Sequence, residues 1–152
     1  MSDGPVLAKG SDDEVRSAMT AGLNVKLPPA DDPASMAEAR RIIDQYRSIQ
    51  RFYEGDDYPL TPYSTAPDAW LAYQLDLGEG EEGIMVVLKR PGSAEASKVL
   101  KPRALDPVAR YRLVDLDGRP ERVLEGRAVP EGLEVRLERA PDSAVIRYRR
   151  ER

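Results

Sequence analysis

Histidine and cysteine are both absent from the 152-residue sequence. Without cysteine the chain forms no disulfide and offers no thiolate nucleophile, and without histidine it has no Ser-His-Asp triad. The common zinc sites, which need these two residue types, are excluded as well. The remaining chemistry rests on carboxylates, Lys, Tyr, Ser and Thr, and we expect neither a metal ion nor a cofactor.

The sequence also lacks a long apolar run and an excess of basic residues. Its apolar runs are shorter than the roughly 18 residues that cross a bilayer, and its start, MSDGPVLAKGSDDE, has neither the basic nor the apolar region of a signal peptide. The net charge of −4 disfavours binding to phosphate backbones, which needs a basic face. We therefore expect a cytoplasmic protein with neither a membrane nor a nucleic acid as partner.

The first half of the chain is predicted to be helical. A short helix is expected at Asp12 to Met19, followed by a strand at Leu23 to Leu27 and then two prolines. A longer helix is expected from Asp32, a suitable N-cap, to about Tyr53. Its apolar positions recur at helical spacing: Met36, Ala39, Ile43, Tyr46, Ile49 or Gln50, and Tyr53. Such a helix is docked on one side and solvated on the other.

The second half of the chain is predicted to be a sheet structure. Residues 55–68 contain three prolines and are expected to form an irregular connector. Seven strand candidates follow, at Ala69 to Leu75, Gly83 to Lys89, Ser97 to Pro102, Tyr111 to Leu116, Glu121 to Glu125, Gly132 to Glu138 and Ser143 to Tyr148. Asp117-Gly118 fits a tight hairpin turn between the fourth and fifth of these strands.

These patterns predict a mainly β fold, an antiparallel β-sandwich of about seven to eight strands with an N-terminal helical lead-in. We divide the chain into the lead-in (1–54), the connector (55–68) and the sandwich (69–152).

Pairs of carboxylates could catalyse glycoside hydrolysis without histidine. The candidate runs are Asp12-Asp13-Glu14, Asp31-Asp32, Asp56-Asp57 and Glu79 to Glu82. Each run is local, whereas a catalytic pair usually converges from separate elements. A solvated surface is the favoured interpretation for every run, and we predict no catalytic residue in this chain.

Seven of the nine aromatic residues fall between positions 46 and 73. Such rings can fill the junction between a helix and a sheet, which is the favoured interpretation, or they can stack on sugars. For the second case the candidate carbohydrate-binding residues are Tyr58, Tyr63 and Trp70.

Several phrases, taken in order, resemble the C-terminal region of glycoside hydrolase family 36, the α-galactosidases. They are ARRIIDQYRSIQRFY, GDDYPLTPYS, AWLAYQLDLGEGEEGIMVVLKRPGS, LDPVARYRLVDLDG and GLEVRLERAPDSAVIRY. The sequence departs from the family pattern at Asp57, where members usually carry an aromatic residue, and at Ala104, where they usually carry glycine. The two catalytic aspartates of the family belong to earlier barrel segments, and no matching motif is present here.

The resemblance implies a non-catalytic accessory domain of an O-glycosyl hydrolase, with the lead-in matching the end of a (β/α)8 barrel. The expected partners are the catalytic barrel of the parent enzyme, a second copy of the chain and a galactoside. The apolar face of the Asp32 helix would then pack on the sandwich, self-associate or stay exposed. The alternative is a stand-alone carbohydrate-binding or structural interaction module.

Overall fold

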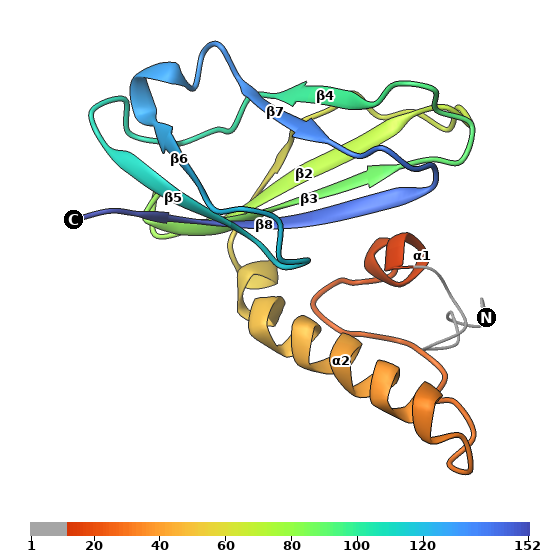
Figure 1. The fold of residues 1–152 in the computed structure, drawn as a ribbon. Coiled ribbons are helices and arrows are strands. Elements are labelled where there is room, and N and C mark those ends of the chain that lie inside the picture. Colours follow the sequence, from red (N-terminus) through yellow and green to blue (C-terminus); the bar gives the residue numbers. More distant parts are fainter. Residues whose placement is uncertain (1–11) are drawn as a thin grey trace.

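The computed structural model describes residues 12–152 as a sandwich of two antiparallel sheets with two helices on one side (Figure 1). The helices are α1 (Asp12–Ser17) and α2 (Pro33–Ile49), which continues as a 3-10 helix at Gln50–Glu54. The strands are β1 (Asp56–Pro59), β2 (Trp70–Leu77), β3 (Glu82–Lys89), β4 (Ser97–Leu100), β5 (Arg110–Asp115), β6 (Arg122–Glu125), β7 (Leu133–Arg136) and β8 (Asp142–Arg150). A 3-10 turn at Gly126–Ala128 lies between β6 and β7.

The larger sheet has the order β1-β2-β3-β8-β5-β6, and the smaller sheet pairs β4 with β7. The predicted mainly β, antiparallel sandwich with a helical lead-in is confirmed, and the described part of the chain has eight strands. The last of these eight strands, β8, lies in the middle of the larger sheet.

The core of the sandwich lies between the larger sheet and the β4–β7 pair. Successive residues of a strand point to opposite faces, so Met85 and Val87 of β3 face this core together with Ile146 of β8. Leu100 of β4 and Val135 of β7 close it from the other side. All five side chains are almost fully buried, which at about 25 cal/mol per Å² makes this layer a main source of stability.

The opposite face of the larger sheet is covered by the helices. Asp32 caps α2 as expected, because its Oδ1 accepts a hydrogen bond from the Ser35 backbone N–H at 3.1 Å. The buried side chains of α2 are Ala39, Ile42, Tyr46 and Ile49. They pack against Leu75, Ile84, Val86 and Val145 of the sheet. The apolar face of this helix was expected to pack on the sandwich, to self-associate or to stay exposed, and the structure shows that it packs on the sandwich.

Two details of the lead-in differ from the sequence prediction. Ile42, which was not on the predicted face, is almost fully buried, whereas Ile43 is only partly buried against the same cluster. Residues 23–27 form no strand and contain only an isolated bridge at Lys26. Within residues 12–152 neither helix combines the length and the apolar character needed to span a membrane.

The sheet also differs from the prediction in three places. The connector contains β1, which pairs with β2 at the edge of the larger sheet, where a proline such as Pro59 is tolerated. The turn at Asp117-Gly118 forms, with Gly118 at φ 77°, but the last β5–β6 pair is Leu113 with Arg122, so the loop is longer than a tight hairpin. Finally, β8 continues beyond the predicted Tyr148 to Arg150.

A buried polar network crosses the middle of the larger sheet. The Tyr148 hydroxyl donates a hydrogen bond to the Asp76 carboxylate, and Gln74 Nε2 donates to the Tyr148 oxygen at 2.8 Å. Burial and the bond to Asp76 raise the pKa of Tyr148 well above its ordinary value, so the hydroxyl keeps its proton at neutral pH. Gly83 makes room for this ring, because a Cβ there would lie 2.2 Å from the Tyr148 hydroxyl oxygen and 2.3 Å from the Leu75 carbonyl oxygen.

We therefore predict that Gly83→Ala lowers the free energy of unfolding by about 2–4 kcal/mol, since it crowds the core and disturbs a buried hydrogen bond. Gly22→Ala is the matched control, because a Cβ at Gly22 meets nothing within 4 Å. We expect that variant to stay within about 1 kcal/mol of the original protein. Urea denaturation measures both values, and equal stabilities of the two variants would refute the packing argument.

Candidate functional site

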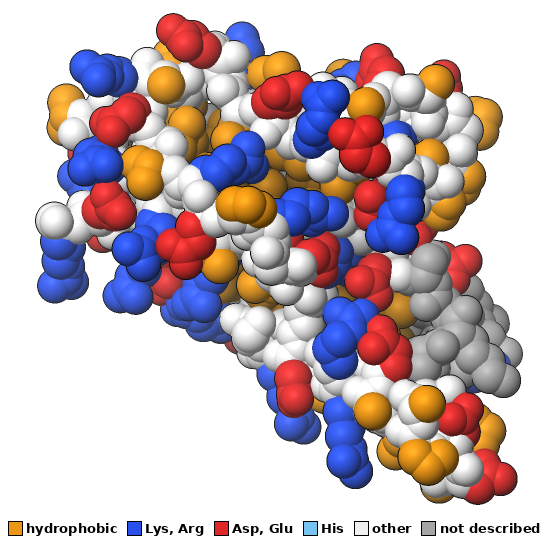
Figure 2. Space-filling model, viewed as in Figure 1, with side chains coloured by type: hydrophobic (Ala, Val, Ile, Leu, Met, Phe, Trp, Pro, Cys, Tyr) orange, Lys and Arg blue, Asp and Glu red, His pale blue; other side chains and the backbone are white. Residues whose placement is uncertain are grey.

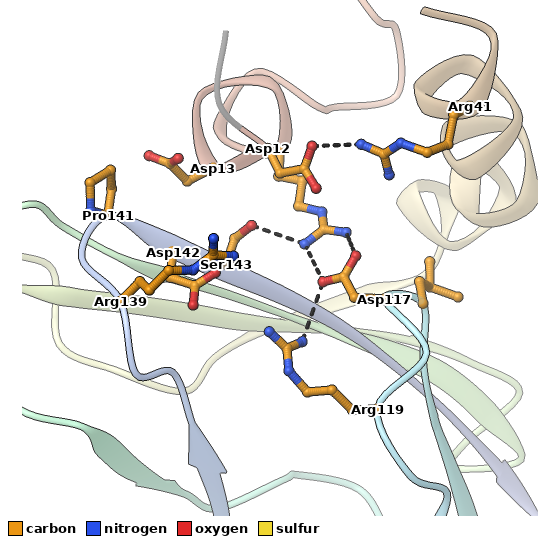
Figure 3. Close-up of a pocket in the computed structure, with 11 residues that line it drawn as sticks. Asp12, Asp13, Arg41, Asp117, Arg119, Arg139, Pro141, Asp142 and Ser143 are labelled. Carbon is orange, nitrogen blue, oxygen red and sulfur yellow. Dashed lines mark hydrogen bonds and ion pairs between the residues drawn. The ribbon is translucent and has the colours of Figure 1, made fainter. Parts of the chain in front are cut away.

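The largest cleft lies where the lead-in meets the sandwich and has a volume of about 630 Å³ (Figure 3). We call it the charged cleft. Its lining comes from α1, α2, the loop after β5 and the start of β8: Asp12, Asp13, Arg16, Arg41, Leu116, Asp117, Arg119, Arg139, Pro141, Asp142 and Ser143. Four arginines and four aspartates are among these residues, so the formal charges of the lining cancel.

Arg16 is the buried centre of this cleft, with only 2% of its surface exposed. Its guanidinium forms a two-pronged ion pair with Asp117, with N–O distances of 2.9 and 2.5 Å. It also donates to Gln45 Oε1 of α2 at 3.2 and 3.0 Å, and to Ser143 Oγ of β8 at 2.9 Å. All five N–H groups of the side chain are therefore used.

Half of the other charges of the cleft also form ion pairs. Arg119 contacts Asp117 at 3.3 Å and Asp115 at 2.8 Å, and Arg41 contacts Asp12 at 2.7 Å. Burial raises the pKa of Asp117, but the hydrogen bonds and charge of Arg16, aided by Arg119, outweigh it and lower the pKa below its ordinary value. Asp117 is thus held as an anion, and its pair with Arg16 binds the lead-in to the sandwich.

The predicted carboxylate runs do not converge on a catalytic pair in the described residues. Asp32 caps α2, and Glu82 forms an ion pair with Arg51 at 2.6 Å. The hydrogen bonds from Arg51 lower the pKa of Glu82. A general acid for glycoside cleavage needs a raised pKa. Among residues 12–152, no three His, Cys, Asp or Glu side chains are grouped so that they could hold a metal ion.

The three predicted carbohydrate-binding residues lie in different environments. Tyr63 is 91% exposed, Tyr58 is half-buried on β1, and Trp70 is only 4% exposed. Trp70 Nε1 donates to Ser93 Oγ at 2.9 Å, and the Lys89 ammonium lies 5.5 Å from the ring centroid. Whether these residues bind sugars stays a prediction.

Trp70 lines a second cleft, of about 390 Å³, which we call the Trp70 cleft. It is formed by the connector, the start of β2 and the β3–β4 loop, with Ser64, Ala66, Asp68, Ala69, Trp70, Gly92, Ser93, Ala94, Glu95 and Lys98 as its lining. Sequence reasoning found Trp70 here but missed Ser93 and Lys98, since neither belongs to a motif. It also missed Arg16, for which the one signal was a basic residue between the apolar positions Val15 and Met19.

Comparisons with known proteins show the fold but not a family. Neither a family model nor a curated protein matches the sequence. One solved structure that matches is described as the galactosidase domain of alpha-galactosidase-sucrose kinase, AgaSK, with a TM-score of 0.67 and 19% identity. The match covers 84% of this chain and 18% of that chain, so the chain has the fold of a small part of that protein.

We predict that Arg16→Met lowers the free energy of unfolding by about 2–4 kcal/mol, because half-buried Asp117 loses its two-pronged partner and keeps the weaker contact with Arg119 at 3.3 Å. Arg41→Met is the control, since Arg41 is 42% exposed and its ion pairs with Asp12 and Glu38 are solvated. We expect that change to cost less than about 1 kcal/mol. Equal losses in chemical denaturation would show that Arg16 is no more important than a surface arginine.

The lowered pKa of Asp117 predicts a specific acid dependence. A carboxyl group with a depressed folded-state pKa stabilises the fold above its unfolded value, here near 3.8, and this contribution is lost as the pH falls through the folded-state pKa. The stability difference between the original protein and Asp117→Asn should therefore be full at neutral pH and shrink below pH 3.8. Denaturant titrations over this range measure it, and a difference that is constant with pH would contradict the assignment.

Proposed function

We propose that this chain is a non-catalytic accessory domain of an α-galactosidase-like glycoside hydrolase. The observation that supports it most is the structural match, because it covers 84% of the chain, more than residues 69–152 alone could supply. The likeness therefore includes part of the lead-in as well as the sandwich. The finer assignment to glycoside hydrolase family 36 is part of this proposal and draws on the resemblance of the sequence phrases.

The chemistry of the described residues is consistent with an accessory role. Glu38, Glu82 and Asp117 have lowered pKa values, because each accepts hydrogen bonds from an arginine that outweigh its burial. Such carboxylates stay ionised and are poor general acids at neutral pH. The pairs of Glu82 with Arg51 and of Asp117 with Arg16 therefore serve to fix the helical lead-in on the sandwich.

The surface offers a place where a catalytic (β/α)8 barrel could pack. The first turns of α2 and the segment before it project beyond the sandwich (Figures 1 and 2). This projecting end carries exposed apolar side chains, with Leu27 62% exposed and Pro29, Ala34 and Ala37 exposed as well. An apolar, exposed end of this kind is typical of a contact surface. A second copy of the chain is the other candidate partner for this surface. The cytoplasmic location expected from the sequence stays a prediction.

We expect the purified chain to leave p-nitrophenyl α-galactoside intact, with release of nitrophenol no faster than in buffer. An intact α-galactosidase is the positive control for the assay. Turnover at an enzyme-like rate would overturn the proposal.

A barrel encoded in the same or the adjacent reading frame should bind the chain, and Leu27→Asp should weaken that binding. Val108→Asp, at a valine that is even more exposed than Leu27, should not.

A further inference from the structure

We propose that the Trp70 cleft is a saccharide-binding site, with Tyr63 as the aromatic ring that stacks on the sugar. This proposal goes beyond the accessory role and does not depend on it. The cleft and its neighbourhood combine a preformed shape, an exposed aromatic ring, and polar side chains that include both hydrogen-bond donors and acceptors. At about 390 Å³ the cleft falls in the range of about 300–1,000 Å³ that is usual for small-molecule sites.

The walls of the cleft are fixed by backbone hydrogen bonds. The Gly92 N–H donates to the Pro67 carbonyl at 2.9 Å, and the Arg90 N–H donates to the Ala69 carbonyl at 3.1 Å. The Arg90 guanidinium donates to the Thr65 carbonyl at 2.8 Å. The connector and the β3–β4 loop are thus bound to each other, so a ligand meets a formed site and loses little affinity to the ordering of loops.

Gly92 is required for this close approach. A Cβ at Gly92 would lie 2.8 Å from the Pro67 carbonyl oxygen, closer than real Cβ contacts occur. A larger residue would therefore push the β3–β4 loop away from the connector and change the shape of the cleft.

Tyr63 is the most exposed of the large hydrophobic side chains identified in the described residues, at 91%. Tyr63 is not itself a lining residue, but it directly precedes Ser64, which lines the cleft, and the residues that follow, Thr65 to Pro67, are held by hydrogen bonds from Arg90 and Gly92. An aromatic ring left in water on an anchored segment is available for stacking, and a sugar presents a face of C–H groups to such a ring.

The polar groups of the cleft suit hydroxyl groups rather than an ion. Asp68 carries a carboxylate with no ion pair in the described part of the chain, and Glu95 and Lys98 contact each other at 3.2 Å near the rim. Together these three charges sum to −1, which disfavours an anionic ligand. Carboxylates accept and the ammonium donates hydrogen bonds, and a sugar with several hydroxyl groups can satisfy both.

The role of Trp70 differs from that of a stacking platform. Its ring is 4% exposed and its Nε1–H is bonded to Ser93, so it forms the rigid base of the cleft. The charged cleft is a weaker candidate although it is larger, because no aromatic residue lines it and most of its charges pair with one another.

The experiment uses the whole chain and the fluorescence of Trp70, which is its only tryptophan. The probes are methyl α-galactoside, methyl α-glucoside, methyl α-mannoside and the disaccharides melibiose, maltose and mannobiose. We expect at least one probe to change the emission of Trp70 saturably, with a Kd on the order of 1 mM. Amide NMR shifts should fall within residues 63–70 and 90–98.

Three variants make the test specific. Tyr63→Ala should weaken binding about tenfold through lost stacking. Tyr63→Phe, which keeps the ring, and Val108→Ala, at a similarly exposed position, should bind like the original chain. Both Tyr63 and Val108 are at the surface, so folding should be unaffected by any of the three variants.

Two results would overturn the proposal. One is the absence of any saturable change with all of the probes. The other is binding that Tyr63→Ala leaves unchanged, or that shifts amides around the charged cleft instead. Either result would leave the accessory role untouched, because the hydrolysis assay and the barrel-binding test measure that role separately.

Discussion

The structure depends on the buried guanidinium of Arg16. A charge with 2% exposure must be paired and fully hydrogen-bonded, or it would cost more than the fold could offset. Its partners come from three places in the chain: Gln45 of α2, Asp117 after β5 and Ser143 of β8. One side chain therefore fixes α1, α2 and the sandwich relative to one another. The hydrogen bonds of Arg16 thereby also fix where Ile42 and Ile49 of α2 pack on the sheet.

Local elements were predictable from the sequence, and long-range partners were not. The cap at Asp32 and the strand periodicity depend on near neighbours, which is why α2 and seven of the strands were foreseen. The pairing of Arg16 with Asp117 spans 101 positions, and no local pattern encodes it. Ala104 lies between these two cases. Its φ of 58° favours glycine, and the sequence resemblance had already marked it as a position where family members usually have glycine.

The two clefts show why charge alone does not mark a binding site. In the charged cleft Arg16, Arg41 and Arg119 form ion pairs with aspartates of the same cleft. The pair of Arg16 with Asp117 holds the lead-in against the sandwich. In the Trp70 cleft the backbone provides the rigidity, through Arg90 and Gly92, and the Asp68 carboxylate is left for a ligand. Trp70 was found from sequence because it belongs to the cluster of aromatic residues between positions 46 and 73. Ser93 and Lys98 joined it only through the fold of the β3–β4 loop.

The central position of β8 has a consequence for the order in which the chain can fold during synthesis. β8 joins β3 to β5, and it supplies Val145 to the helix contact and Ser143 to Arg16. While residues 142–150 are still in the ribosome, the β1-β2-β3 meander and the β5–β6 hairpin have no strand between them. The facing edges of β3 and β5 stay unpaired until then, and the larger sheet can be completed only after β8 has left the ribosome.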